Sequence, residues 1–177
     1  AEVSALKDVD GDGVADLVYM SSGAIRWAKP DPANPTGPWL STQVGEQGTY
    51  IAHGIGAGDV NGDGIPDFMA GVPGRSPGGI ANAGEVYVVF GRRDSTDVDL
   101  GTLGAGGFTI EGHIENQYLR PGRAAGDVNG DGLDDIVFGP GTEEKSYVIF
   151  GKASTGPVAL GNIGPAGFAI SGPAGEL

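Results

Sequence analysis

The chain has 177 residues, of which 39% are hydrophobic, so it is long enough and apolar enough to fold around a packed core. Its formal net charge of −13 disfavours nucleic acid and anionic membranes as partners, and the absence of cysteine excludes disulfides, thiol catalysis and zinc–thiolate sites. No apolar run reaches the roughly 18 residues of a membrane span, so we expect no membrane insertion.

Short apolar segments separated by turns follow one another along the chain, since 35 glycines and 12 prolines leave little room for long helices. The first set of strands is predicted at ALKD (5–8), DLVYMS (16–21), AIRWAK (24–29) and WLSTQV (39–44). A second set is predicted at 55–59, 67–72, 85–91 and 107–111, and a third at 123–127, 135–139, 145–151 and 167–171.

The second and third sets are copies of one unit. EVYVVFG (85–91) matches KSYVIFG (145–151), and GGFTIEG (106–112) matches AGFAISG (166–172), in each case 60 residues further on. The extra length of the second unit falls in the Gly- and Pro-rich segment 71–84, where a loop tolerates insertion. About 60 residues with four strands per unit are typical of a β-propeller blade. We therefore predict an all-β fold of about three four-stranded antiparallel blades, at 1–45 (short and divergent), 46–112 and 113–177.

An acidic loop of nine residues occurs three times, as DVDGDGVAD (8–16), DVNGDGIPD (59–67) and DVNGDGLDD (127–135). Each copy places an oxygen-bearing side chain at positions 1, 3, 5 and 9 and glycine at position 6. Calcium takes six to eight oxygen ligands in flexible geometry, and the carbonyl of position 7 would add to the four side chains. The predicted ligands are Asp8, Asp10, Asp12, Val14 and Asp16; Asp59, Asn61, Asp63, Ile65 and Asp67; and Asp127, Asn129, Asp131, Leu133 and Asp135.

About three calcium ions are therefore expected, one between the first two strands of each blade. Magnesium fits less well, because it prefers octahedral sites and retains its waters. Acidic loops of this kind also occur in EF-hands, where position 12 is acidic and a helix follows. Here position 12 is Tyr19, Ala70 or Phe138, and the next residues are apolar or rich in Gly and Pro, which favours a strand.

The string GDVNGDGIPDFMAGVPG (58–74), together with the VYVVFG and GF landmarks, resembles FG-GAP repeats, the blades of integrin α-subunit propellers. The first unit is more similar to the shorter VCBS-type variant. In that family the cation loop joins the first two strands of a blade and faces away from the ligand-binding surface. The resemblance thus implies a recognition or adhesion module in which the ions hold the blades in shape.

Propellers of that family close with about seven blades, whereas three are predicted here, and three sheets leave terminal faces and edges open. Joining SGPAGEL (171–177) to AEVSALKDVDGDG (1–13) gives a segment similar to EGHIENQYLRPGRAAGDVNGDG (111–132), so the ends are in register to continue one another. Two alternatives remain open. The chain is a piece of a longer propeller, or two copies form a head-to-tail homodimer with six blades. The start at Ala1 without a signal-like stretch fits a processed or trimmed chain.

Catalysis finds little support, because the chain has no GxSxG elbow and no HExxH motif. We expect a non-enzymatic module that binds a protein or glycan ligand. Trp39, Tyr50 and Tyr118 are the candidate ligand-binding aromatics, whereas Trp27 lies in a predicted strand and is interpreted as core. The alternatives are a lectin, the non-catalytic propeller of a polysaccharide-degrading enzyme, and a purely structural, calcium-stiffened spacer.

The predicted calcium requirement favours an extracellular or cell-surface location. Extracellular modules bind calcium with dissociation constants of about 10⁻⁴–10⁻³ M. Millimolar external calcium then stabilises the fold by about 0.5–1.5 kcal/mol per site. In the cytosol this contribution would vanish, and the carboxylates of each loop would repel one another.

Overall fold

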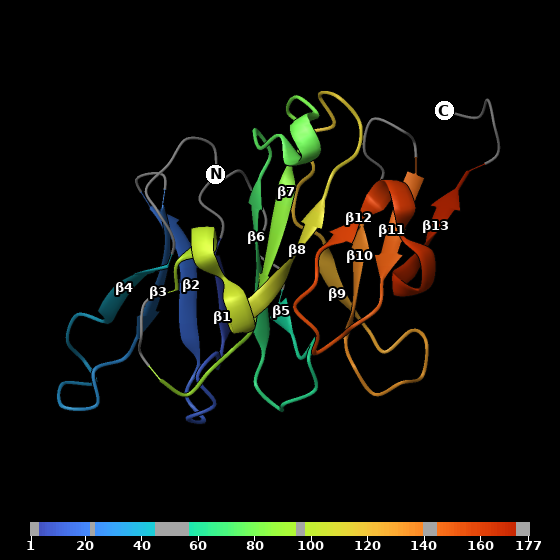
Figure 1. Cartoon of the computed structure of the whole chain (residues 1–177). Helices are drawn as coiled ribbons and strands as arrows, with labels where there is room; N and C mark the ends of the chain where they lie inside the picture. Colours follow the sequence, from blue (N-terminus) through green and yellow to red (C-terminus); the bar gives the residue numbers. More distant parts are fainter. Residues whose placement is uncertain (1–3, 22–23, 45–56, 95–97, 140–144, 173–177) are drawn as a thin grey trace.

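The computed structural model describes residues 4–21, 24–44, 57–94, 98–139 and 145–172. These residues form three sheets that stand side by side in chain order, as Figure 1 shows. We call the sheets blades 1, 2 and 3. Within the described ranges the remaining regular structure consists of short 3₁₀ turns, η1 to η5, at Pro77–Gly79, Leu100–Thr102, Gly104–Gly106, Leu160–Asn162 and Gly164–Ala166.

Each blade is built mainly from antiparallel neighbours. Blade 1 consists of β1 (Ser4–Lys7), β2 (Asp16–Ser21), β3 (Ala24–Lys29) and β4 (Leu40–Val44). Blade 2 contains β5 (Ala57–Gly58), β6 (Asp67–Val72), β7 (Glu85–Val89) and β8 (Gly107–Glu111). Blade 3 contains β9 (Arg123–Gly126), β10 (Asp135–Phe138), β11 (Lys145–Ile149) and β13 (Gly167–Ser171).

The predicted all-β blades are confirmed, and the sequence prediction missed one strand. This is β12 (Val158–Ala159), which pairs in parallel with β8, so that Val158 lies opposite Ile110. β12 follows β11 of blade 3 in the chain but pairs with β8 of blade 2. The sheet of blade 2 therefore has five strands, in the order β12-β8-β7-β6-β5. Backbone hydrogen bonds therefore tie the third unit to blade 2.

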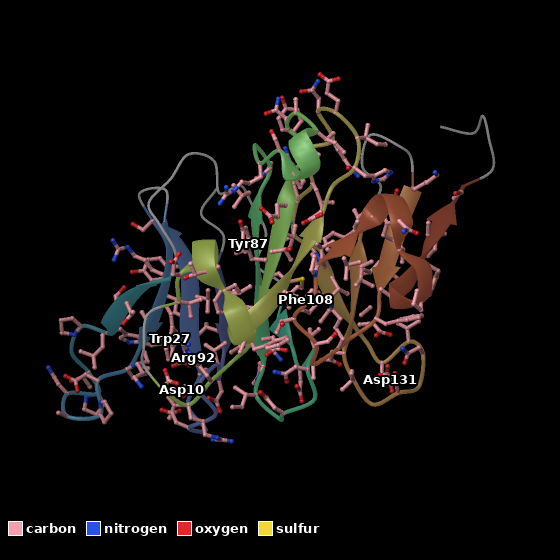
Figure 2. The ribbon with its side chains drawn as sticks, viewed as in Figure 1. Asp10, Trp27, Tyr87, Arg92, Phe108 and Asp131 are labelled. Carbon is pink, nitrogen blue, oxygen red and sulfur yellow. The ribbon has the colours of Figure 1, made fainter. Side chains whose placement is uncertain are left out.

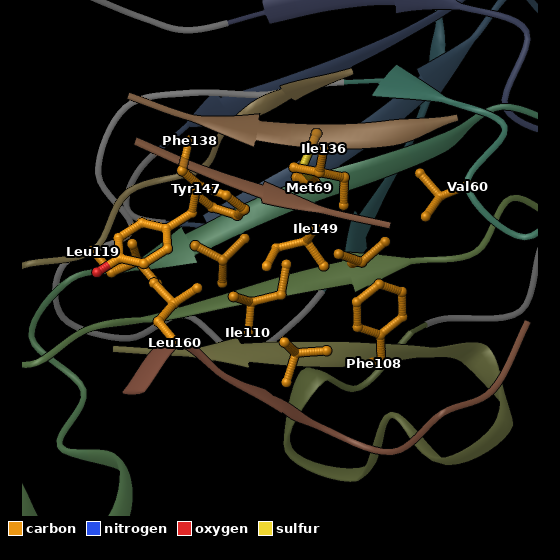
Figure 3. Close-up of a cluster of buried hydrophobic side chains, with 13 residues drawn as sticks. Val60, Met69, Phe108, Ile110, Leu119, Ile136, Phe138, Tyr147, Ile149 and Leu160 are labelled. Carbon is orange, nitrogen blue, oxygen red and sulfur yellow. The ribbon is translucent and has the colours of Figure 1, made fainter. Parts of the chain in front are cut away.

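The main core lies between blades 2 and 3, where alternate residues of each strand face the neighbouring sheet (Figure 3). Val86 and Val88 of β7 and Phe108 and Ile110 of β8 point toward blade 3 and are at most 1% exposed. Blade 3 contributes four side chains that are at most 4% exposed: Ile136, Phe138, Tyr147 and Ile149.

A second, smaller core joins blades 1 and 2. The other face of blade 2 contributes Phe68, Ala70, Tyr87 and Val89, and blade 1 contributes Val18 together with Val9 from its acidic loop. Trp27 packs against this cluster, which agrees with its interpretation as a core residue. Both faces of blade 2 are thus covered, as expected of a middle blade in a row.

The outer face of blade 3 is open. Phe168 and Ile170 are 41% and 50% exposed, whereas Phe108 and Ile110, which hold the same places in blade 2, are 1% and 0% exposed. The second residue of the acidic loops follows the same trend, with Val9 at 5%, Val60 at 1% and Val128 at 50%. Blade 3 therefore presents the surface that, on blade 2, receives the next blade.

None of the helical segments among the described residues has the length and apolar character needed to cross a bilayer.

The core between blades 2 and 3 predicts a specific stability loss. Phe108→Ala should lower the free energy of unfolding by about 3–5 kcal/mol, because it leaves a cavity beneath β8. Leu40→Ala on β4, where the side chain is 49% exposed, should cost less than about 1 kcal/mol. Urea denaturation in the presence of calcium measures both, and equal losses would contradict the assignment of this core.

Candidate metal sites

The three acidic loops lie on one edge of the molecule, because each connects two neighbouring strands in the same sense. They join β1 to β2, β5 to β6 and β9 to β10, and Figure 1 shows them together at the lower edge. Asp10 of loop 1 and Asp131 of loop 3 mark two of them in Figure 2. We call this side the metal-loop edge and name the loops 1, 2 and 3 in chain order.

The first aspartate folds each loop by accepting backbone N–H groups across the turn. In loop 2 the Asp59 carboxylate accepts from Gly62, Asp63 and Gly64 at 2.8, 3.1 and 2.9 Å. Asp127 accepts from the corresponding N–H groups of loop 3, and the bonds from Gly132, Gly130 and Asp131 hold its pKa below the ordinary value. The glycine at position 6 has a positive φ of 82° in loop 2 and 89° in loop 3, which explains its identity.

The side chains at positions 3 and 5 of each loop also accept hydrogen bonds from backbone N–H groups of the turn. Asn61 Oδ1 accepts from Asp63 N at 2.9 Å, and Asp63 Oδ1 accepts from Ile65 N at 2.8 Å. The Asn61 amide also donates to Asp63 Oδ2 at 2.9 Å, and Asn129 and Asp131 repeat this pair in loop 3. Carboxylate and amide oxygens thus gather over a preformed backbone, which is the donor set that calcium prefers.

The ninth-position aspartate connects its loop to the end of the blade's third strand. Asp67 is 1% exposed; its Oδ2 accepts from Val60 and Asn61, and its Oδ1 accepts from Gly91 at 2.8 Å. Asp135 makes the equivalent bonds with Val128 and Gly151. Burial raises the pKa of Asp67 to about 7, although the Gly91, Val60 and Asn61 N–H groups lower it and the Asp63 charge raises it further.

Loop 1 lacks one of these bonds. Asp16 Oδ2 accepts from Val9 N at 3.0 Å, but Asp16 Oδ1 is buried without a hydrogen-bond partner. The strand register explains the gap, since Pro30 stands where Gly91 and Gly151 stand, and proline has no N–H to donate.

The unpaired oxygen of Asp16 is the observation that best fits a bound cation. Asp16 is fully buried, and burial raises its pKa, with the Asp10 charge acting in the same direction. Ligand atoms of Asp8, Asp10 and Asp16 lie within 4.8 Å of one another. Buried carboxylates that converge in this way are costly unless a positive charge balances them. A divalent cation in loop 1 would supply that charge and a partner for Asp16 Oδ1.

Two cationic side chains contact loop 1, and neither was predicted from the sequence. Lys29 Nζ lies 3.0 Å from Asp10 Oδ2, and this bond raises the pKa of Lys29. Arg93 of blade 2 donates to the Gly11 carbonyl at 2.6 Å. Lys29 Nζ also lies 5.5 Å from the centroid of the Trp27 ring, and Figure 2 shows Trp27 near Asp10. The Trp27 indole N–H has no hydrogen-bond partner, but its proximity lowers the pKa of Asp16.

The loops also hold neighbouring blades together. The Val9 carbonyl of loop 1 accepts from Arg92 N of blade 2 at 3.1 Å. Between loops 2 and 3, Asp134 N donates to the Asp59 carbonyl at 2.9 Å, and Asp59 N donates to Asp134 Oδ2 at the same distance. Gly151 passes so close that a Cβ there would lie 2.8 Å from the Val60 carbonyl oxygen. A loop that changes shape must therefore disturb the next blade.

The predicted ligand-binding aromatics do not gather in one place. Trp39, 40% exposed, precedes β4 on the metal-loop edge, while Tyr118, 44% exposed, lies in the β8–β9 connection on the opposite edge. Tyr50 lies outside the described residues. Trp39 and Tyr118 therefore cannot contact the same small ligand.

The opposite edge carries an ordered pair of connections, 73–84 and 112–122. Asn82, Asn116 and Tyr118 are the non-glycine residues of the described chain with positive φ, at 51°, 57° and 51°. Asn82 Nδ2 donates to Asn116 Oδ1 at 2.9 Å, and Tyr118 N donates to the Asn82 carbonyl at the same distance. Asparagine tolerates this conformation but tyrosine rarely adopts it, so the two connections hold Tyr118 in place at some cost in energy.

Comparisons with known proteins agree with this architecture. The profile of a family described as FG-GAP-like repeat matches residues 8–70, and that of the FG-GAP repeat matches residues 52–89. The chain is 31% identical over 175 residues to integrin alpha-PS2 of Drosophila melanogaster, covering 86% of this chain and 11% of that protein. It is 26% identical over 182 residues to integrin alpha pat-2 of Caenorhabditis briggsae, covering 84% and 14%.

Among solved structures, a lectin of Agrocybe aegerita that recognises non-reducing terminal N-acetylglucosamine has a similar fold. The TM-score is 0.51 at 19% identity, over 89% of this chain and 37% of that one. With the strand order above, the likeness defines the chain as a row of β-propeller blades. The family matches make these blades FG-GAP-type repeats, similar to those of integrin α-subunits. The chain spans a small part of the curated relatives, 11% and 14% of their lengths.

The raised pKa of Asp67 predicts pH-dependent calcium binding at loop 2. The carboxylate must lose its proton to act as a ligand, so affinity should fall about tenfold per pH unit below pH 7. Calorimetric titration with calcium at pH 8, 7 and 6 measures this step. Asp67→Asn keeps one oxygen ligand and should bind more weakly without the pH dependence. Equal wild-type affinity at pH 8 and pH 6 would contradict the prediction.

Proposed function

We propose that this chain is a calcium-stabilised propeller module for recognition outside the cell, with its ligand on the edge opposite the metal loops. The observation that carries the proposal is the buried ninth-position aspartate, which links an acidic loop to the blade that contains it. Asp16, Asp67 and Asp135 are all at most 1% exposed. Three carboxylates buried where a loop meets its blade are most readily explained by three bound cations.

Calcium is the proposed ion, and the ligands are those predicted for the three loops. The donors are carboxylate, amide and carbonyl oxygens, and flexible oxygen sites of this kind suit calcium better than magnesium. Ordinary extracellular calcium would fill sites of about 10⁻⁴–10⁻³ M affinity, which supports a location at the cell surface or beyond. The ions would stabilise the blades rather than take part in a reaction, and we propose no catalytic role.

Recognition is proposed for the edge formed by connections 73–84 and 112–122. Tyr118 projects an exposed ring there, and Asn82 and Asn116 supply amide groups fixed by their mutual hydrogen bond. An aromatic face with hydrogen-bonding amides beside it suits a sugar or a polar peptide. The similarity to integrin α-subunits supports a protein ligand, and the fold shared with the lectin makes a glycan the natural first probe.

A glycan array that includes terminal N-acetylglucosamine tests this surface. Tyr118→Asn removes the ring while suiting the positive φ, and it should weaken binding about tenfold. Trp39→Ala, on the metal-loop edge, should leave binding unchanged. If the wild type binds neither the array nor a panel of purified matrix and cell-surface proteins, the recognition role is wrong and the spacer alternative is favoured.

We also propose that two copies close head to tail into a six-bladed ring. The open face of blade 3 has the apolar residues that blade 2 uses to hold a following blade, including Phe168 and Ile170. Blade 1 presents Leu17 and Tyr19 at the places of Ile136 and Phe138. Leu6, on the same face as Leu17, is 64% exposed. Blade 1 of a second copy therefore offers blade 3 an apolar face whose residues correspond to those that blade 3 itself packs against blade 2.

Sedimentation analysis in calcium tests the assembly. The expected species has twice the 17.8 kDa mass of the chain, and Ile170→Asp should return it to a monomer because a charge would be buried at both interfaces. Leu40→Asp introduces the same charge at an exposed apolar residue outside the proposed interface and should leave the dimer intact. A wild-type chain that stays monomeric with calcium would contradict the closed dimer.

A further inference from the structure

Lys29 occupies an unusual place in the repeat. By strand register it stands where Phe90 and Phe150 stand in blades 2 and 3. Those two rings pack against Phe108 and Phe168, with centroids 6.1 and 6.0 Å apart. The ammonium group of Lys29 instead reaches the acidic loop of its own blade. Blade 1 therefore has Lys29 in place of the phenylalanine that blades 2 and 3 share, and this lysine places a positive charge beside loop 1.

The contact is made with a predicted ligand that has little access to water. Lys29 Nζ lies 3.0 Å from Asp10 Oδ2, and the Asp10 side chain is 3% exposed. Loops 2 and 3 have asparagine at this position, and each amide donates to the fifth-position aspartate of its own loop. At the predicted ligand positions loop 1 therefore has one carboxylate more than loops 2 and 3, and the Lys29 ammonium binds this additional carboxylate.

We propose that Lys29 is a built-in counter-ion of loop 1 that competes with calcium for Asp10. The inference rests on the proposed calcium binding and adds a residue that sets the affinity of one loop. Without calcium, the ammonium neutralises one of the four carboxylates and keeps the loop in shape. When calcium enters, the ammonium must leave Asp10 or stay within a few ångströms of a doubly charged ion.

The size of the effect follows from the surroundings of Lys29. Like charges a few ångströms apart repel strongly in a protein interior and weakly in water. The Lys29 side chain is 30% exposed, and its flexible stem allows the ammonium to swing toward solvent. Competition rather than exclusion is expected, so that loop 1 binds calcium on the order of tenfold more weakly than it would without the charge. Arg93 donates to the Gly11 carbonyl and, among the described residues, not to a carboxylate of loop 1.

Terbium luminescence reports on loop 1 alone. Terbium occupies calcium sites, and an ion in loop 1 would lie beside the Trp27 indole, which can sensitise its emission. The experiment uses a Trp39→Phe background, so that Trp27 is the sole tryptophan of the 177 residues. Displacement of terbium by calcium then gives the calcium affinity of loop 1.

Three variants separate charge from structure. Lys29→Met removes the charge and keeps an unbranched side chain, and it should bind calcium about tenfold more tightly at loop 1. Lys29→Arg keeps the charge and should match the wild type. Lys152→Met, in blade 3, makes the same change in net charge away from loop 1 and should also match the wild type. Added potassium chloride should narrow the difference between Lys29→Met and the wild type.

Two results would overturn the inference. If Lys29→Met binds calcium at loop 1 as the wild type does, or more weakly, Lys29 is not a competitor, while calcium binding by the loops stands. If neither protein shows sensitised terbium emission, the counter-ion role and the calcium assignment of loop 1 both fail. Binding by Lys29→Met alone would overturn the calcium assignment of loop 1 in the wild-type chain, while Lys29 would stand as the residue that keeps the ion out.

Discussion

The buried aspartate that ends each acidic loop is the interaction on which the rest of this structure depends. In blades 2 and 3 its two oxygens bind the start of the loop and the glycine at the end of the third strand. A carboxylate in such a place is stable only if hydrogen bonds and a positive charge offset the loss of water. The hydrogen bonds are present, and the loop is arranged so that a cation can supply the charge. The ends of the strands, the shape of the loop and the proposed ion binding therefore depend on one another.

The two edges of the molecule differ in what holds them together. On the metal-loop edge, Val9, Val60 and Asp134 reach from one unit to the next, so the loops act as fasteners between blades as well as within them. The opposite edge is held by backbone hydrogen bonds between two connections and is independent of the acidic residues. A ligand there would meet a surface that contains none of the predicted calcium ligands.

Much of the fold follows from the sequence, because short apolar segments between Gly- and Pro-rich turns, together with the 60-residue repeat, identify the strands of each blade. The two-residue strand β12 was missed, since its pairing with β8 depends on how the third unit packs and leaves no local pattern. The first unit is short and divergent in sequence, and it lacks the FG pair that ends VYVVFG. The consequence of Lys29 and Pro30 at that place, however, appears only when the strand register is known. The separation of Trp39 from Tyr118 likewise depends on which edge each connection occupies.

Calcium dependence of unfolding tests the central claim most directly. Near-ultraviolet circular dichroism of the chain during heating should show a midpoint several degrees higher in millimolar calcium than in EGTA, because three sites together contribute about 1.5–4.5 kcal/mol. Magnesium at the same concentration should recover a minor part of the shift. Superimposable unfolding curves in calcium and EGTA would show that the acidic loops do not fasten the blades through a bound ion.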